Sequence, residues 1–138
     1  MSLKYLLDTN IVSEPLRPSP ATTTLRRLRR HEGETAIASI VWHELQFGCA
    51  RLPKSRRRAA IERYFEEVVL ASFPMLDYDR TAAEWHAGER ARLEAAGKTP
   101  PFIDGQIAAI ASVNDLVLVT VNKADFRGFK GLRVQSWA

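Results

Sequence analysis

The sequence is poor in the residues that build disulfide frameworks and zinc sites. Its 138 residues contain one cysteine, Cys49, and three histidines. A lone cysteine cannot form an internal disulfide, and the apolar helical pattern around Cys49 predicts a small buried hydrophobic side chain. The histidines, at positions 31, 43 and 86, lack the spacing of zinc ligands. The sequence therefore indicates neither a disulfide scaffold nor zinc chemistry.

Long apolar runs and phosphate-binding loops are also missing. No run reaches the roughly 18 residues of a membrane-spanning helix, and the amino terminus lacks the charged-then-apolar layout of a signal peptide. No glycine-rich loop is followed by Lys and Ser or Thr, which excludes P-loop nucleotide hydrolysis. We therefore expect a cytoplasmic protein without a membrane partner. Because no repeat, low-complexity tract or long linker divides the chain, we expect one domain over residues 1–138.

Positive charge is present and clustered. The chain carries 20 Lys and Arg against 16 Asp and Glu, a formal net charge of +4. One basic cluster lies within residues 26–30 and a second within residues 51–58. Such clusters attract phosphate backbones, but a run of charge is also typical of a solvated helix face, so both interpretations stay open. No interleaved aromatic residues predict a platform for stacking single-stranded bases.

Short apolar runs alternate with helical patterns along the chain. Strands are expected over residues 5–7, 35–38, 73–76, 116–120 and 132–137, and helices over residues 22–30, 39–52, 57–70, 81–96 and 104–114. Ser39 is the expected N-cap of its helix, and Gly97 is expected to end another. This alternation predicts an α/β fold, a three-layer α/β/α domain with a short, mainly parallel five-stranded sheet.

The helical patterns also predict buried stripes. In the helix over residues 57–70 the expected buried side chains are Ile61, Tyr64, Phe65 and Val68. In the helix over residues 81–96 they are Ala82, Trp85, Ala91 and Leu93.

Four carboxylates stand at positions where α/β domains place their chemistry. Asp8 follows the first strand and Asp125 follows the strand over residues 116–120, and in a parallel sheet both positions lie at the carboxyl edge. Glu44 has an apolar helix face around it, where an unpaired carboxylate is costly. Asp104 opens a helix rich in alanine, which allows close packing. Structural alternatives exist: Asp8 suits a helix N-cap, and the helix dipole favours an acid at Asp104.

A cluster of carboxylates without basic partners points to divalent metal chemistry. Converging acids repel one another and resist ionisation, and a divalent cation resolves that conflict. Oxygen ligands without His or Cys select Mg²⁺ or Mn²⁺. Such ions, in a chain rich in arginine, fit phosphodiester cleavage, in which a metal-activated water attacks phosphorus and the metal stabilises the leaving oxygen.

The four acids lie within sequence motifs that resemble those of a known family. The motifs are LDTN at 7–10, SEPLR at 13–17, HELQFG at 43–48, DGQIAA at 104–109 and TVNKADF at 120–126. Together, and in this order, they resemble the PIN-domain ribonucleases of the VapC type, in particular the FitB-like branch, over nearly the whole chain. VapC proteins are the toxins of toxin–antitoxin pairs.

The resemblance implies a site, a cofactor and partners. The catalytic and metal-binding acids would be Asp8, Glu44, Asp104 and Asp125, with Mg²⁺ or Mn²⁺ as the cofactor. The supporting polar residues would be Thr9, Thr120 and Asn122, which orient the acids or a metal-bound water. The implied activity is endoribonuclease cleavage of RNA, leaving 5′-phosphate and 3′-hydroxyl ends. The implied partners are the RNA substrate, a second copy of the chain, and an antitoxin whose carboxyl-terminal tail covers the acidic pocket. That antitoxin would bind operator DNA, so no direct, specific DNA binding is expected of this chain.

Three other interpretations compete with this one. The main one is a catalytically silent PIN-fold module that partners a DNA-binding, antitoxin-like protein, although such a module has no physical reason to keep four repelling acids. A haloacid-dehalogenase-like phosphatase needs a second aspartate two positions after Asp8, where this chain has Asn10. A receiver domain needs an acid pair at the end of the first strand, which Thr9 and Asn10 leave incomplete.

Overall fold

The computed structural model describes residues 2–138, and within this part of the chain five strands form one sheet in the order β3-β2-β1-β4-β5. The strands are β1 (Tyr5–Leu7), β2 (Thr35–Ala38), β3 (Met75–Leu76), β4 (Val117–Val119) and β5 (Val134–Gln135). All four neighbouring pairs are parallel. The predicted fold class is therefore confirmed, with a sheet that is parallel throughout.

Helices fill every connection between the strands. Between β1 and β2 lie α1 (Thr9–Val12), the 3₁₀ helix η1 (Glu14–Leu16) and α2 (Thr22–Arg30). Between β2 and β3 lie α3 (Ser39–Ala50), α4 (Arg56–Tyr64), the π helix η2 (Phe65–Val69) and α5 (Leu70–Ser72). Between β3 and β4 lie α6 (Arg80–Ala95) and α7 (Phe102–Val113), and the short 3₁₀ helix η3 (Lys123–Phe126) precedes β5.

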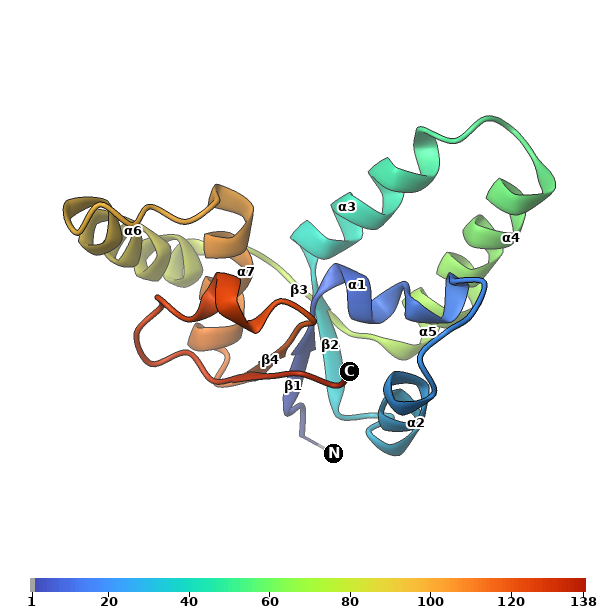
Figure 1. The fold of residues 1–138 in the computed structure, drawn as a ribbon, viewed down its shortest axis with the longest axis horizontal. Helices are drawn as coiled ribbons and strands as arrows, with labels where there is room; N and C mark the ends of the chain where they lie inside the picture. Colours follow the sequence, from blue (N-terminus) through green and yellow to red (C-terminus); the bar gives the residue numbers. More distant parts are fainter. Residues whose placement is uncertain (1) are drawn as a thin grey trace.

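The strand order reverses beside β1. The chain steps outward from β1 to β2 to β3, then returns to the other side of β1 as β4. The helices of the two halves accordingly lie on opposite sides of the sheet, with α3 and α4 projecting on one side and α6 on the other (Figure 1). In open parallel sheets, ligands bind at the carboxyl ends of the strands where the order reverses. Here that point lies between the ends of β1 and β4.

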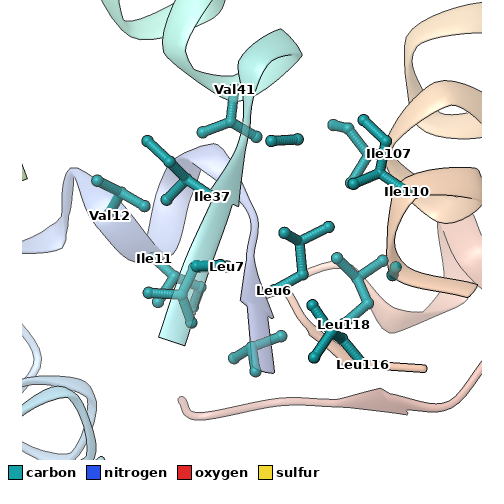
Figure 2. Packing of buried hydrophobic residues seen from close by; sticks show 14 of the residues in the cluster. Leu6, Leu7, Ile11, Val12, Ile37, Val41, Ile107, Ile110, Leu116 and Leu118 are labelled. Carbon is teal, nitrogen blue, oxygen red and sulfur yellow. The ribbon is translucent and has the colours of Figure 1, made fainter. Parts of the chain in front are cut away.

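The core explains why β1 is central. Leu6 and Leu118 are paired in register and point toward Ile110 on α7, whereas Leu7 points to the opposite face, beside Ile11 of α1 (Figure 2). All of these side chains are fully buried. Because successive strand residues alternate between faces, a strand covered by helices on both sides reads as a continuous apolar run.

The start of α3 differs from the sequence prediction. Its N-cap is Ala38, which supplies no side-chain hydrogen bond, and Ser39 is already the first helical residue. The strand β2 ends at Ala38, so it continues into the helix with no intervening residue. The predicted N-cap role of Ser39 is therefore wrong, because the cap position belongs to the strand.

The single helix expected over residues 57–70 is interrupted by a π turn. Phe65 is buried and Ile61 and Tyr64 are partly buried, as predicted, but Val68 is 40% exposed and Val69 is fully buried. A π turn holds more residues than an α turn, so it moves the buried stripe along by one residue. The prediction for Val68 is wrong for that reason.

The buried stripe of α6 also differs. Ala82 and Leu93 are buried and Trp85 packs against the core, but Ala91 is exposed. In place of Ala91 the stripe contains His86, which is 2% exposed and lies one turn after Ala82. The prediction for Ala91 is wrong because the buried face of α6 runs from Ala82 through His86 to Leu93, and Ala91 lies outside that face.

The end of α6 agrees with the sequence. Gly97 adopts a left-handed conformation (φ 71°) just after the helix, as its role as a stop requires.

Two further observations concern the absences noted in the sequence. Cys49 is buried and has a free thiol, as predicted. No helix in the part of the chain that the structure describes combines the length and the apolar character needed to cross a bilayer.

The displaced stripe gives a matched pair of substitutions. Val69→Ala removes two buried methyl groups and should lower the free energy of unfolding by about 2 kcal/mol. Val68→Ala, on the same helical turn, should change it by less than about 0.5 kcal/mol. Urea unfolding followed by circular dichroism measures both. Equal losses for the two variants would contradict the π turn.

Candidate active site at the carboxyl edge of the sheet

Asp8 is the first residue after β1 and is held by hydrogen bonds at both carboxylate oxygens. Its Oδ1 accepts the backbone N–H of Thr9 at 2.8 Å, which makes Asp8 the N-cap of α1. Its Oδ2 accepts the hydroxyl of Thr120 at 2.9 Å, across the β1–β4 boundary. The two interpretations of Asp8, as a helix N-cap and as a site residue, are thus compatible. The same carboxylate caps α1 and lies at the point where the strand order reverses.

Thr120 is the residue that fixes Asp8 from the second strand. It is fully buried, directly after β4. While its hydroxyl donates to Asp8, it accepts the backbone N–H of Asn122 at 3.1 Å. Asn122 therefore contributes its backbone, and its side chain forms no hydrogen bond with residues 2–138. The arrangement leaves the Asp8 carboxylate one settled orientation.

Glu44 is brought to the same edge by α3. Its Oε1 accepts the Thr9 hydroxyl at 3.0 Å. Thr9 therefore links two acids, because its N–H binds Asp8 and its hydroxyl binds Glu44. The expected apolar face around Glu44 is only partly buried, since Val41 is buried but Phe47 is 55% exposed. The carboxylate is thus at the rim of the core, and a threonine hydroxyl satisfies one of its oxygens.

Asp104 lies in the first turn of α7, where the charges of the other three carboxylates affect its pKa. Partial burial and, after it, the negative charges of Asp8, Asp125 and Glu44 together raise its pKa to about 6 from an ordinary 3.8. Desolvation and like charges both disfavour the ionised form. The raised pKa of Asp104 thus reflects the proximity of the four predicted acids in the folded chain.

Asp8 and Asp125 complete this electrostatic picture. Burial raises the pKa of Asp8, hydrogen bonds from Thr120 and Thr9 lower it, and the charge of Asp125 raises it again. Asp125 itself is exposed, in η3 just after β4. It therefore stands at the open side of the cluster, where solvent or a ligand reaches it.

The cluster is suited to an ion that keeps part of its water. Within residues 2–138, no group of three or more His, Cys, Asp or Glu side chains is arranged so that it could hold a metal ion. Mg²⁺ is usually bound by one or two carboxylates and retains several waters, so it does not require such a group. The donors are carboxylate and hydroxyl oxygens, with no imidazole or thiol among them.

Sequence reasoning missed the contact that positions Asp104. The ring of His86, on α6, lies against the backbone of α7 at Gly105, so that a Cβ added there would overlap Nε2 of the ring. The ring cannot swing aside, because its Nδ1 is 2.8 Å from the Tyr78 hydroxyl and the ring of Phe102 packs on it with centroids 4.8 Å apart. His86 thus determines how closely the first turn of α7, which carries Asp104, approaches α6. The i, i+4 spacing from Ala82 was the signal in the sequence.

The fold and these residues define a known class of domain. The chain matches the PIN domain over residues 5–132, and it therefore belongs to the PIN-domain family. Among its relatives are the tRNA(fMet)-specific endonuclease VapC of Shigella flexneri, 32% identical over 137 residues and 99% of each chain, and toxin FitB of Neisseria gonorrhoeae, 32% identical over 124 residues, 88% of this chain and 89% of FitB.

Solved structures agree with these relatives. The crystal structure of FitAcB from Neisseria gonorrhoeae superposes with a TM-score of 0.87 at 29% identity, covering 94% of this chain and 95% of that one. The DNA-bound VapBC of Salmonella typhimurium superposes with a TM-score of 0.86 at 29% identity, covering 99% of each chain. The resemblance to VapC-type and FitB-like toxins that the motifs indicated is confirmed.

The raised pKa of Asp104 predicts a pH-dependent stability. Unfolded Asp104 ionises near 3.8 and folded Asp104 near 6, so the unfolded chain releases its proton first and metal-free stability falls as pH rises through this window. Asp8, whose pKa is also raised, acts in the same direction. In a chelator, Asp104→Asn should flatten this decline in melting temperature. Mg²⁺ or Mn²⁺ should raise the wild-type melting temperature more above the window than below it, since the ions bind ionised carboxylates.

Glu94→Gln is the matched control for that measurement, because Glu94 is an exposed carboxylate on α6 that does not contribute to the raised pKa of Asp8 or Asp104. It should keep the wild-type pH profile and the wild-type response to metal. A decline that is identical in wild type and Asp104→Asn would show that Asp104 does not carry the effect.

The contact between His86 and Gly105 predicts a non-additive pair of substitutions. Gly105→Ala should cost about 1–3 kcal/mol of unfolding free energy, because its Cβ would overlap the imidazole. His86→Ala also costs stability, but it empties the space that the new Cβ needs. Gly105→Ala should therefore cost clearly less in the His86→Ala background than in wild type. Strictly additive losses in urea unfolding would contradict the proposed contact.

Proposed function

We propose that this chain is a divalent-metal-dependent endoribonuclease and the toxin of a type II toxin–antitoxin pair. The observation that carries the proposal is the convergence of Asp8, Glu44, Asp104 and Asp125 where the strand order reverses, with pKa values that burial and neighbouring carboxylates raise at Asp8 and Asp104. The relatives named as VapC ribonucleases, at 32% identity over nearly the whole chain, support the same activity. A silent binding module would gain nothing from a cluster whose charges repel.

The residues fit Mg²⁺ or Mn²⁺. Their donors are hard oxygens, and the raised pKa values of Asp8 and Asp104 show that the folded chain disfavours their charged forms, a cost that a bound cation would relieve. A bound cation would activate water for in-line attack on phosphorus and stabilise the leaving oxygen. We assign the ion to Asp8 and Asp104, with Glu44 and Asp125 completing its surroundings directly or through water.

The chain's own residues prepare this chemistry. Thr120 and Thr9 hold the Asp8 carboxylate so that it does not reorient when substrate arrives. Thr9 holds Glu44 in the same way. Exposed Asp125 can accept a proton or a water-mediated hydrogen bond at the open side. The expected products carry 5′-phosphate and 3′-hydroxyl ends.

The basic cluster within residues 51–58 is the better candidate for RNA contact. It connects α3, which carries Glu44, to α4, and Arg57 and Glu44 line one cavity. The other cluster is on α2, which lies toward the amino ends of the strands, near the carboxyl terminus of the chain (Figure 1). We propose that RNA approaches along α3 and α4, and that its binding weakens steeply with salt.

The solved structures that resemble this chain suggest which proteins it binds. FitB is named as a toxin, and the solved structures that superpose on this chain are FitAcB and a VapBC that is bound to DNA. We propose that this chain binds an antitoxin whose tail covers the acidic edge, and that it forms a homodimer. Specific DNA contact would belong to the antitoxin.

Removal of charge from the cluster tests the activity. Induced expression of wild type, Asp8→Asn and Asp104→Asn, with sequencing of RNA 5′ ends, should give growth arrest and new 5′-phosphate ends only in wild type. Cleavage should fall by about 100-fold or more in both variants. Thr120→Val keeps the shape but loses the hydroxyl that holds Asp8, and it should cost about 10- to 100-fold.

Glu94→Gln is again the control, and it should arrest growth like wild type. New RNA ends in both asparagine variants at wild-type levels would refute a metal-dependent nuclease at this edge. A wild-type protein that binds a partner but generates no new RNA ends would favour the silent module.

A further inference from the structure

A cavity of about 360 Å³ opens beside the acidic edge, between α1 and η1 on one side and α3 and α4 on the other. Thr9 and Glu44, which are hydrogen-bonded to each other, line it. Its walls continue over apolar side chains that include Leu45 and Ile61. The cavity is therefore continuous with the candidate active site, and whatever fills it lies next to the acids.

Gly48 borders this cavity on open space. It lines the cavity from α3, one turn after Glu44. Glycine inside a helix costs stability, and a close contact is the usual structural reason for it. Here a Cβ at position 48 would meet no described atom within 4 Å. Packing therefore does not require the glycine, and open space beside the acids is what it provides.

Two guanidinium groups line the same cavity. Arg17 comes from the loop after η1 and Arg57 from the first turn of α4. Arg17 is exposed and pairs with Glu14 at 3.4 Å, a long contact. Arg57 pairs with no carboxylate within residues 2–138. Arginines around an apolar hollow are complementary to an occupant with an apolar planar part and more than one negative charge.

We propose that this cavity binds one unstacked nucleotide of the RNA substrate, adjacent to the phosphate that is cut. The base lies against the apolar wall and the flanking phosphates contact Arg17 and Arg57. Sequence-specific RNA recognition mostly reads bases that are splayed out of the strand, and this cavity has room for one. The proposal rests on the ribonuclease function proposed above and gives that function a subsite for base selection.

Filling the cavity at Gly48 tests the proposal without disturbing the packing. Gly48→Leu adds a side chain into open space and replaces a helical glycine by a good helix former, so its melting temperature should be no lower than that of wild type. Gly88→Leu is the matched control. Gly88 is an exposed helical glycine of α6 that takes no part in the cavity, and a Cβ added there would also meet no described atom within 4 Å.

The first readout needs no metal. Fluorescence anisotropy with a labelled, random-sequence single-stranded RNA, in a chelator, should show about tenfold weaker binding for Gly48→Leu than for Gly88→Leu or wild type. The second readout is the sequence around new RNA 5′ ends in expressing cells. With Gly48→Leu these ends should decrease, or lose their preference at the position next to the cut.

Arg57 allows an independent check with a neighbouring control. Arg57→Gln should weaken RNA binding and reduce the salt slope by about one, as expected for one lost phosphate contact. Arg56→Gln removes the same charge from the preceding residue, which is exposed and does not line the cavity. Equal effects of the two variants would mean diffuse electrostatic steering and would overturn the role given to Arg57.

The remaining outcomes separate this proposal from the function on which it rests. If Gly48→Leu binds and cuts RNA like Gly88→Leu, the cavity holds no nucleotide, while the nuclease stands. If Gly48→Leu cuts normally but is no longer neutralised by the antitoxin, the occupant is a protein partner and the proposal is overturned. If wild type itself neither binds nor cuts RNA, the proposed function fails, and the loss is not specific to Gly48.

Discussion

The constraint on which this structure depends is a carboxylate placed at the end of a buried strand. Asp8 follows the central strand β1, which helices cover on both faces, and its side chain is partly buried. Burial raises its pKa, and the hydrogen bonds from Thr9 and Thr120 only partly offset that cost. The fold thus maintains a charge in an unfavourable position, held from two neighbouring strands. A carboxylate that is kept in one orientation against its own desolvation is prepared for a ligand of opposite charge.

The helices around that point add further acids, and their packing determines how close the acids come. The α7 helix brings Asp104 to the edge, and the buried ring of His86 on α6 supports it at Gly105. The apolar contacts of α6, α7 and the sheet offset the repulsion among the carboxylates. A protein that tolerates such a cluster gives up some stability for a function, as active sites commonly do.

Two glycines of this chain illustrate opposite uses of a missing side chain. At Gly105 the space of a Cβ is taken by His86, so the glycine permits a close approach that positions an acid. At Gly48 the corresponding space is empty and faces a cavity that Thr9 and Glu44 also line. Each glycine follows an acid of the cluster by one helical turn or less. The first serves the geometry of the site and the second leaves room beside it.

The sequence by itself determined the architecture and indicated which carboxylates follow the buried strands. The apolar run before Asp8, the buried strand before Asp125 and the alternation of strands with helices depend on local periodicity, which short segments carry on their own. It also determined α2, whose bounds agree with the prediction. Only the tertiary structure decided that Val69 is buried in place of Val68, that the ring of His86 lies against Gly105, and that Gly48 borders a cavity. These features depend on contacts between segments far apart in the chain, and the helical pattern of one segment does not contain them. The sequence therefore indicates which groups could react, and packing decides where they stand and what fits between them.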